Sequence, residues 1–148
     1  TPLLRFVQKG RGVTSLTGEK LYESQVLAAV GSAIGEFGRG LRFVMMLADE
    51  AAATYHLYVE TDPGPRPPAV RLAKVVDAKL ALTNIEYRCK RESGRLGQIV
   101  AHWLGDHTSD AFKHFCVANG QREGQYKPVA LSLRSSLAFD FERFVATE

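Results

Sequence analysis

The stretch Leu41–Ala48 constrains the fold more than any other part of the sequence, because apolar residues occupy nearly all of its positions. Successive residues of a strand point to opposite faces of a sheet, so a strand that is apolar on both faces must be covered on both. A second run, Thr54–Glu60, follows after a short turn, and its Tyr55, Leu57 and Val59 point to one face. We therefore predict a central antiparallel hairpin inside a layered domain.

Two segments have the apolar spacing of helices that can cover this hairpin: about Tyr22 to Ile34, and Ala69–Thr83. The segment Asn84–Gly97 is interpreted as a polar and basic connection. The remaining predicted elements are short strands at Leu3–Val7, Val13–Leu16 and Ile99–Leu104, a helix that begins near Thr108 or Asp110 with Phe112, Phe115 and Cys116 on its apolar face, and a final helix capped by Ser135 or Ser136 that carries Leu137, Phe141, Phe144 and Val145.

This order of elements is typical of a two-layer α+β domain. We expect a small mixed, mostly antiparallel sheet, an N-terminal β-hairpin within residues 1–17, and three to four helices on the sheet. Prolines and glycines of 62–68 form a loop within one domain, so residues 1–148 are predicted to be a single unit. A doubly wound parallel sheet is disfavoured, because a hairpin joins two of the main strands.

Composition limits the classes of function. The 148 residues, 45% hydrophobic and 24% charged, are those of an ordinary globular domain. A net charge of +3 fits phosphate-bearing ligands but does not demand nucleic acid. No apolar run approaches the roughly 20 residues of a membrane span. Two cysteines without metal or redox spacing, and no signal peptide, favour a reducing cytoplasm. The abrupt start at Thr1 indicates a piece of a longer chain.

The segment Gly120–Pro128 is too rich in glycine and polar residues to be core. Lys127 precedes Pro128, which disfavours the helical backbone conformation and holds Lys127 extended. A lysine on such a loop can project a compact positive charge into a neighbouring site. The alternative is a solvated loop lysine, which is the commoner case.

Other motifs have plain structural explanations. Gly10-Arg11-Gly12 lacks the spacing of a phosphate-binding loop and is interpreted as a turn. His102, His107 and His114 lack the spacing of metal ligands, so we predict surface or interface histidines and no metal site. The basic run Arg88–Arg95 leaves three possibilities open: a solvated polar loop, a phosphate-binding segment, or a patch for nucleic acid.

Three stretches, taken together and in this order, resemble the plant auxin-responsive acyl-acid amido synthetase family and its bacterial relatives, which belong to the adenylate-forming enzymes. They are Arg5–Gly12 followed by Gly18–Leu21, then Asn84-x-x-Tyr87-x-x-x-Arg91 followed by Gly94–Gly97, and then Gln125–Pro128 with Gly120 upstream. The first is similar to the passage from the large domain of such enzymes into their mobile C-terminal domain. The sequence departs from the family where Val129 directly follows Pro128 and where Gly105–Thr108 replaces a Gly-Thr-Phe motif.

The resemblance implies that this chain is the C-terminal lid of a ligase whose N-terminal adenylation domain holds ATP and Mg²⁺. That enzyme would activate a carboxylic acid and conjugate it to an amine, such as an amino acid, or to a thiol. The family pattern implies Lys127 as the catalytic residue, with cofactor contacts from Gln125, Tyr126, Lys20 and Arg91, and a hinge at Gly10, Arg11 and Gly12.

The chain lacks the ATP loop of the large domain, so we expect the isolated fragment to bind no cofactor and to be inactive. Arg91 and Tyr87 are also candidates for ordering their own segment, and Glu19 and Lys20 for a plain connection between a strand and a helix. Two other functions remain open. One is a stand-alone binding module of α+β fold, and the other is a basic nucleic-acid-binding domain.

Overall fold

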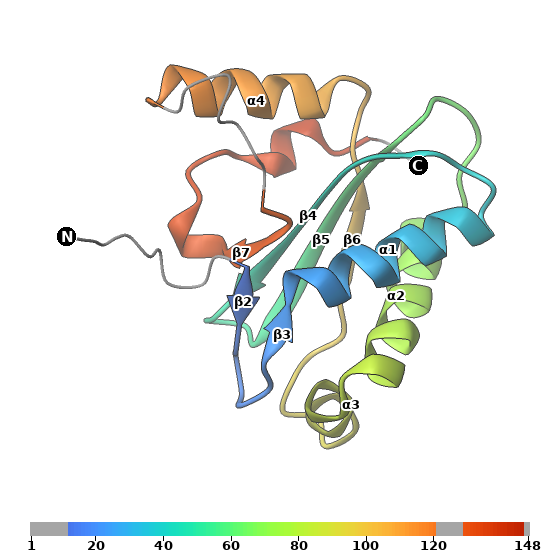
Figure 1. Cartoon of the computed structure of the whole chain (residues 1–148), viewed down its shortest axis with the longest axis vertical. Coiled ribbons are helices and arrows are strands. Elements are labelled where there is room, and N and C mark those ends of the chain that lie inside the picture. Colours follow the sequence, from blue (N-terminus) through green and yellow to red (C-terminus); the bar gives the residue numbers. More distant parts are fainter. Residues whose placement is uncertain (1–11, 121–128, 147–148) are drawn as a thin grey trace.

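The computed structural model describes residues 12–120 and 129–146 (Figure 1). Its centre is a four-stranded sheet in the order β6-β5-β4-β7. The strands β4 (Leu41–Asp49) and β5 (Thr54–Thr61) form the predicted antiparallel hairpin. On either side, β6 (Val100–Trp103) runs parallel to β5, and β7 (Leu131–Leu133) runs parallel to β4. The mixed sheet and the α+β class agree with the sequence prediction.

Helices and the C-terminal segment cover the two faces of this sheet. The helices α1 (Glu23–Glu36) and α2 (Ala69–Thr83) lie together on one face, and α4 (Thr108–Ala118) lies across the other (Figure 1). A short helix, α3 (Ile85–Glu92), follows α2 almost directly. The two predicted amphipathic helices are confirmed, and so is the helix that begins at Thr108.

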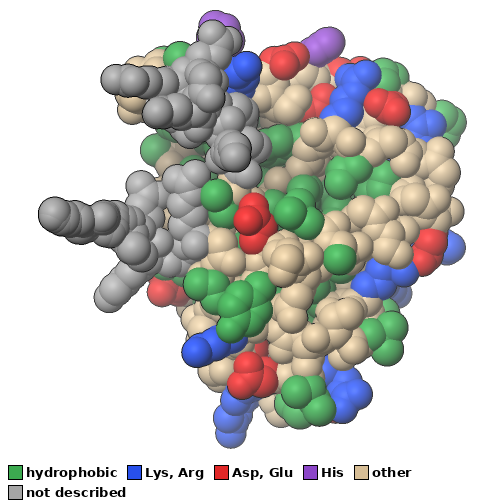
Figure 2. All heavy atoms as spheres, in the orientation of Figure 1, with side chains coloured by type: hydrophobic (Ala, Val, Ile, Leu, Met, Phe, Trp, Pro, Cys, Tyr) green, Lys and Arg blue, Asp and Glu red, His purple; other side chains and the backbone are tan. Residues whose placement is uncertain are grey.

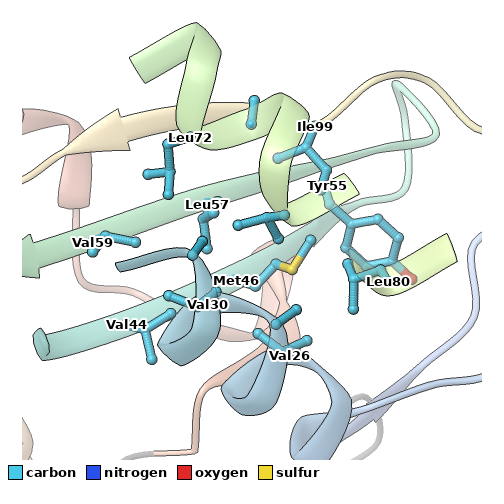
Figure 3. Packing of buried hydrophobic residues seen from close by; sticks show 14 of the residues in the cluster. Val26, Val30, Val44, Met46, Tyr55, Leu57, Val59, Leu72, Leu80 and Ile99 are labelled. Atoms are coloured by element: carbon cyan, nitrogen blue, oxygen red, sulfur yellow. The ribbon is translucent and has the colours of Figure 1, made fainter. Parts of the chain in front are cut away.

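The larger core fills the space between α1, α2 and the sheet (Figure 3). Val26 and Val30 from α1 meet Met46 and Leu57 from the central strands, and Leu72 from α2 completes the contact. All five side chains are fully buried. Each burial contributes roughly 1.5–3 kcal/mol relative to exposure, which is why the apolar stripes predicted the packing.

A second, smaller core lies on the opposite face of the sheet. Phe43, Met45 and Leu47 point away from α1 and α2 because they alternate with the residues of the larger core. Phe112 of α4 and Phe141 of the C-terminal segment pack against them, with the Phe43 and Phe141 rings 5.8 Å apart. The apolar residues on both faces of β4 are therefore buried, as the sequence predicts.

Two predicted elements are wrong. The connection Asn84–Gly97 contains α3, whose first turn is capped by the Asn84 side chain accepting from the Tyr87 amide at 2.9 Å. The predicted final helix is absent, because the described residues after β7 form two 3₁₀ turns, Arg134–Ser136 and Phe141–Phe144, and no α-helix. Its aromatic rings reach the second core from an irregular backbone instead of from one face of a helix.

The N-terminal part of the described chain forms a second, two-stranded sheet. Val13–Thr14 (β2) pairs antiparallel with Leu21–Tyr22 (β3). The predicted strand Leu3–Val7 lies outside the described residues, so its pairing stays a prediction. In Figure 1, β2 lies beside β7 and β3 leads directly into α1.

Two further observations concern membrane-spanning helices and the cysteines. Among the described residues, every helix is too short or too polar to serve as a membrane span. Cys89 and Cys116 are not joined by a disulfide.

Candidate functional site where the hinge and the loop meet

Gly12, the last residue of the predicted hinge, lies at a junction of three elements. Its amide donates to the Leu131 carbonyl of β7 at 2.8 Å, and its carbonyl accepts from the Glu23 amide of α1 at 2.9 Å. Its φ of +82° favours glycine, because a β-carbon strains this conformation. The other hinge candidates, Gly10 and Arg11, lie outside the described residues.

The described end of the predicted lysine loop lies at the same junction. The Ala130 amide donates to a Glu23 carboxylate oxygen at 2.8 Å, and the Ala130 carbonyl accepts from the Met46 amide at 2.7 Å. Val129 is close enough that a β-carbon on Gly12 would lie 3.8 Å from it. The catalytic candidate Lys127, with Gln125 and Tyr126, lies outside the described residues.

The hinge end and the loop end are therefore joined, although more than a hundred residues separate them in the sequence. We call this junction the seam and define it as Gly12, Glu23 and 129–131. Two backbone hydrogen bonds from Gly12 and one carboxylate contact from Glu23 fix its geometry. Because its amide and its carbonyl are both bonded within the domain, Gly12 is tied to β7 and to the start of α1.

Glu19 holds the connection between β2 and β3 against the sheet. Its carboxylate is fully buried and accepts hydrogen bonds from the Leu16 and Thr17 amides, the Thr17 hydroxyl and the Tyr55 hydroxyl. Burial, the largest influence, raises the pKa of Glu19, but these hydrogen bonds together hold it below its ordinary value. Glu19 is therefore ionised at neutral pH and anchors the segment that follows the predicted hinge.

Lys20, a predicted cofactor contact, is exposed on the same connection. Its backbone is fixed by α3, because its carbonyl accepts from the Asn84 side-chain amide at 2.6 Å. Its own amide donates to Glu86 at 3.3 Å. The side chain of Lys20 can thus face a ligand on the solvent side while its backbone stays in place.

Arg91, the other described cofactor candidate, contacts the interior of the domain. Its Nε donates to Asp77 at 2.8 Å and one terminal nitrogen donates to the Leu96 carbonyl at 3.1 Å. The buried Tyr87 hydroxyl donates to the same Asp77 oxygen at 2.5 Å. The hydrogen bond to Asp77 raises the pKa of Arg91 further. Asn84, Tyr87 and Arg91 thus tie α3 to its neighbours, which is the ordering role considered from the sequence.

The three sequence-predicted histidines occupy separate places. His102 lies on β6, and His107 precedes α4 with a side chain that is 78% exposed. His114 lies on the outer side of α4. His56, on the neighbouring strand, lies close to His102, and no local spacing predicted this contact because the two residues are far apart in the chain.

Lys and Arg side chains form no continuous patch on the face that Figure 2 shows. There, Lys and Arg side chains lie apart from one another along the edges, with acidic side chains between them. Within the run, Arg91 is paired with Asp77. The described residues of this face therefore offer no concentrated positive surface for a phosphate backbone.

Comparison with known proteins identifies the family. The family model described as "GH3 family C-terminal domain" matches residues 24–136, which is most of the chain. The search of curated proteins found no match.

Solved structures share the fold. The structure titled "GH3.15 acyl acid amido synthetase" superposes with a TM-score of 0.76 at 20% identity, over 93% of this chain and 27% of that chain. A second structure, titled as AtGH3.15 acyl acid amido synthetase in complex with 2,4-DB, gives a TM-score of 0.73 at 20% identity, over 93% of this chain and 26% of that chain. The chain thus spans about a quarter of the length of these synthetases. From the family match, the chain belongs to the GH3 family, and it corresponds to the family's C-terminal domain.

Proposed function

We propose that this domain is the mobile lid of an ATP-dependent ligase that activates a carboxylic acid and conjugates it to an amine or a thiol. The observation that carries the proposal is the seam, where the Gly12 amide is hydrogen-bonded to Leu131, just beyond the lysine loop. A hinge at 10–12 would then move the base of the loop that carries Lys127. Membership of the GH3 family supports the same assignment.

In the first half-reaction, a carboxylate oxygen of the acid attacks the α-phosphorus of ATP. The new oxygen–phosphorus bond forms as the bond to the bridging oxygen breaks, and pyrophosphate leaves. Negative charge builds on the phosphate oxygens, so a fixed positive charge there lowers the barrier. Lys127 supplies this charge in our proposal. An ammonium group about 4 Å from a phosphate oxygen attracts it by on the order of 4 kcal/mol, before the cost of desolvation is subtracted.

In the second half-reaction, an amine or thiol attacks the acyl carbon and AMP leaves, while the nucleophile loses its proton. The partner is an N-terminal adenylation domain of the same protein, which holds ATP, Mg²⁺ and the acid. Mg²⁺ bound in that domain would supply positive charge to the triphosphate. From the lid, Lys20, Gln125 and Tyr126 would approach the nucleotide. Arg91 would act more indirectly, because its guanidinium is bonded to Asp77 and Leu96.

The test compares the intact protein with the isolated 148-residue chain in a pyrophosphate-release assay. A panel of alkyl and aryl carboxylic acids is supplied with ATP and Mg²⁺. We expect acid-dependent pyrophosphate release from the intact protein and none from the isolated chain. Absence of release from the intact protein with every acid, together with ligand binding by the isolated chain, would favour the stand-alone binding module.

A further inference from the structure

Two histidines and a glutamate from three separate elements converge beside the second core. One ligand atom each of His56, His102 and Glu142 lies within 4.8 Å of the other two. The histidine side chains are 16% and 22% exposed, and that of Glu142 is 46% exposed. The three thus form a half-buried group with one open side.

Strand pairing explains how the histidines meet. In the parallel register of β5 and β6, Tyr58 is opposite His102, and His56 lies two residues before Tyr58 on the same face. The two imidazole rings are nearly parallel, with centroids 6.3 Å apart. The Tyr58 hydroxyl donates to Glu142, which brings the carboxylate from the 3₁₀ turn Phe141–Phe144 to the histidines.

We propose that His56, His102 and Glu142 bind a divalent transition-metal ion such as Zn²⁺. Two imidazoles and one carboxylate are a donor set that binds zinc and leaves a coordination position open. Zinc bonds of about 2.1 Å place neighbouring ligand atoms about 3.4 Å apart. The His102 Nε2 and the nearest Glu142 oxygen are already 3.7 Å apart, so small side-chain rotations suffice. This site does not depend on the proposed ligase activity.

The surroundings of His56 resemble those of a metal ligand. Asp49 lies 3.3 Å from Nε2, and a carboxylate behind a ligating imidazole orients the ring and raises its basicity. Nδ1 is buried and has no hydrogen-bond partner among the described residues.

The positive charge of Arg134 would repel a bound metal ion, so replacing Arg134 tests where the ion binds. One guanidinium nitrogen lies 3.1 Å from His56 Nε2 and 3.1 Å from an Asp49 oxygen. Its side chain is 43% exposed, so it can turn into solvent when a cation binds. Asp49 would then keep His56 and the Ala52 amide as its partners.

A cavity of about 210 Å³ adjoins the group and is open to solvent. Tyr58, Arg134, Asp140 and Glu142 contribute polar groups to its wall. A bound metal ion could therefore keep a water molecule or a small anionic ligand in its open position.

Zn²⁺ titration of the 148-residue chain by calorimetry tests the proposal. We expect one ion per chain with a Kd of about 10 µM or lower, weakened at least about tenfold in His102→Gln and in Glu142→Gln. Glu142 is the decisive position, because its side chain is nearly half exposed and its Gln variant can still accept from Tyr58. The matched control is His114→Gln on α4, which should bind like the wild type.

Two outcomes would overturn the site. One is an absence of stoichiometric Zn²⁺ binding by the wild-type chain. The other is binding that survives Glu142→Gln but is lost in His114→Gln, which would indicate an unrelated surface contact. A third variant, Arg134→Gln, should bind Zn²⁺ at least about threefold more tightly, because a competing positive charge is removed. Weaker binding in that variant would contradict the assigned position.

Discussion

Glu19 is a carboxylate without exposed surface, held by four hydrogen bonds from two neighbouring residues and from Tyr55. Tyr55 also shares its hydroxyl with Thr14 of β2 at 2.9 Å. Burial raises the pKa of Tyr55, so its hydroxyl remains a neutral donor to Glu19. A charged side chain in this position fixes the segment that follows the hinge to the central strand β5.

Replacing Glu19 by glutamine tests this anchor. Glutamine keeps the shape but brings an NH₂ group toward donors, so Glu19→Gln should lower the free energy of unfolding by about 1–3 kcal/mol at pH 7. The carboxylate stabilises the fold above its unfolded pKa, ordinarily 4.5, and this contribution is lost as the pH falls through the lower pKa of the folded state. The deficit of the variant should therefore shrink on acidification.

Urea denaturation at several pH values between neutral and acidic conditions measures both effects. The control is Glu92→Gln, a change of the same kind at the exposed end of α3, which should unfold like the wild type. An unchanged midpoint for Glu19→Gln at pH 7 would show that the buried charge contributes nothing to the anchor.

At the scale of elements, α3 connects the layer formed by α1 and α2 to the segment β2–β3. Asn84 caps α3 through the Tyr87 amide, and its side-chain NH₂ donates to the Lys20 carbonyl and to Gln25. One side chain thus joins α3, the β3 connection and the start of α1. Removing the Asn84 side chain leaves the Tyr87 amide and the Lys20 carbonyl without these hydrogen bonds.

We expect Asn84→Ala to destabilise the domain by about 1–2 kcal/mol, through the lost cap and the lost contact to Lys20. Amide hydrogen exchange should accelerate at Tyr87 and in residues 16–22 more than in α2. The matched control is Asn119→Ala at the exposed end of α4, which should leave exchange at these sites unchanged. Equal acceleration in both variants would mean that Asn84 does not hold these elements together.

The elements that were predictable from sequence are those whose stability comes from apolar burial. The alternation in Leu41–Ala48 and the stripes of α1 and α2 appear directly in the larger core. The helix α3 was missed because it buries only Tyr87 and depends on polar contacts with distant partners. The final helix was predicted wrongly because Phe141 and Phe144 have helical spacing but reach the second core by aromatic packing from 3₁₀ turns.

At the scale of the whole molecule, sheet order brings distant segments to one place. The parallel pairing of β7 with β4 carries the end of the lysine loop to the sheet edge, where the Gly12 amide meets Leu131. Sequence motifs indicated the hinge and the loop separately. Their contact at the seam depends on this crossover and on Glu23, neither of which leaves a local signal in the sequence.

The family motif on α3 and the group of two histidines and a glutamate differ in how far apart their residues lie in the sequence. The motif residues Asn84, Tyr87 and Arg91 could be found through the resemblance to the family, because they lie close together in the sequence, at the cap and within one short helix. The group of His56, His102 and Glu142 could not, because three elements contribute one ligand each. Local spacing identifies residues of one helix, whereas sites assembled by a sheet require its topology.

In our proposal, the lid delivers the Lys127 ammonium group to the phosphate of ATP during adenylation. The measurement is stopped-flow pyrophosphate release by the intact protein with saturating ATP and its carboxylic acid, for Lys127→Ala and for the control Lys74→Ala on the exposed side of α2. We predict a rate lower by about a hundredfold or more for Lys127→Ala, the scale of losing one charge-stabilising donor, and an unchanged rate for Lys74→Ala. A wild-type rate in the Lys127→Ala variant would contradict the account.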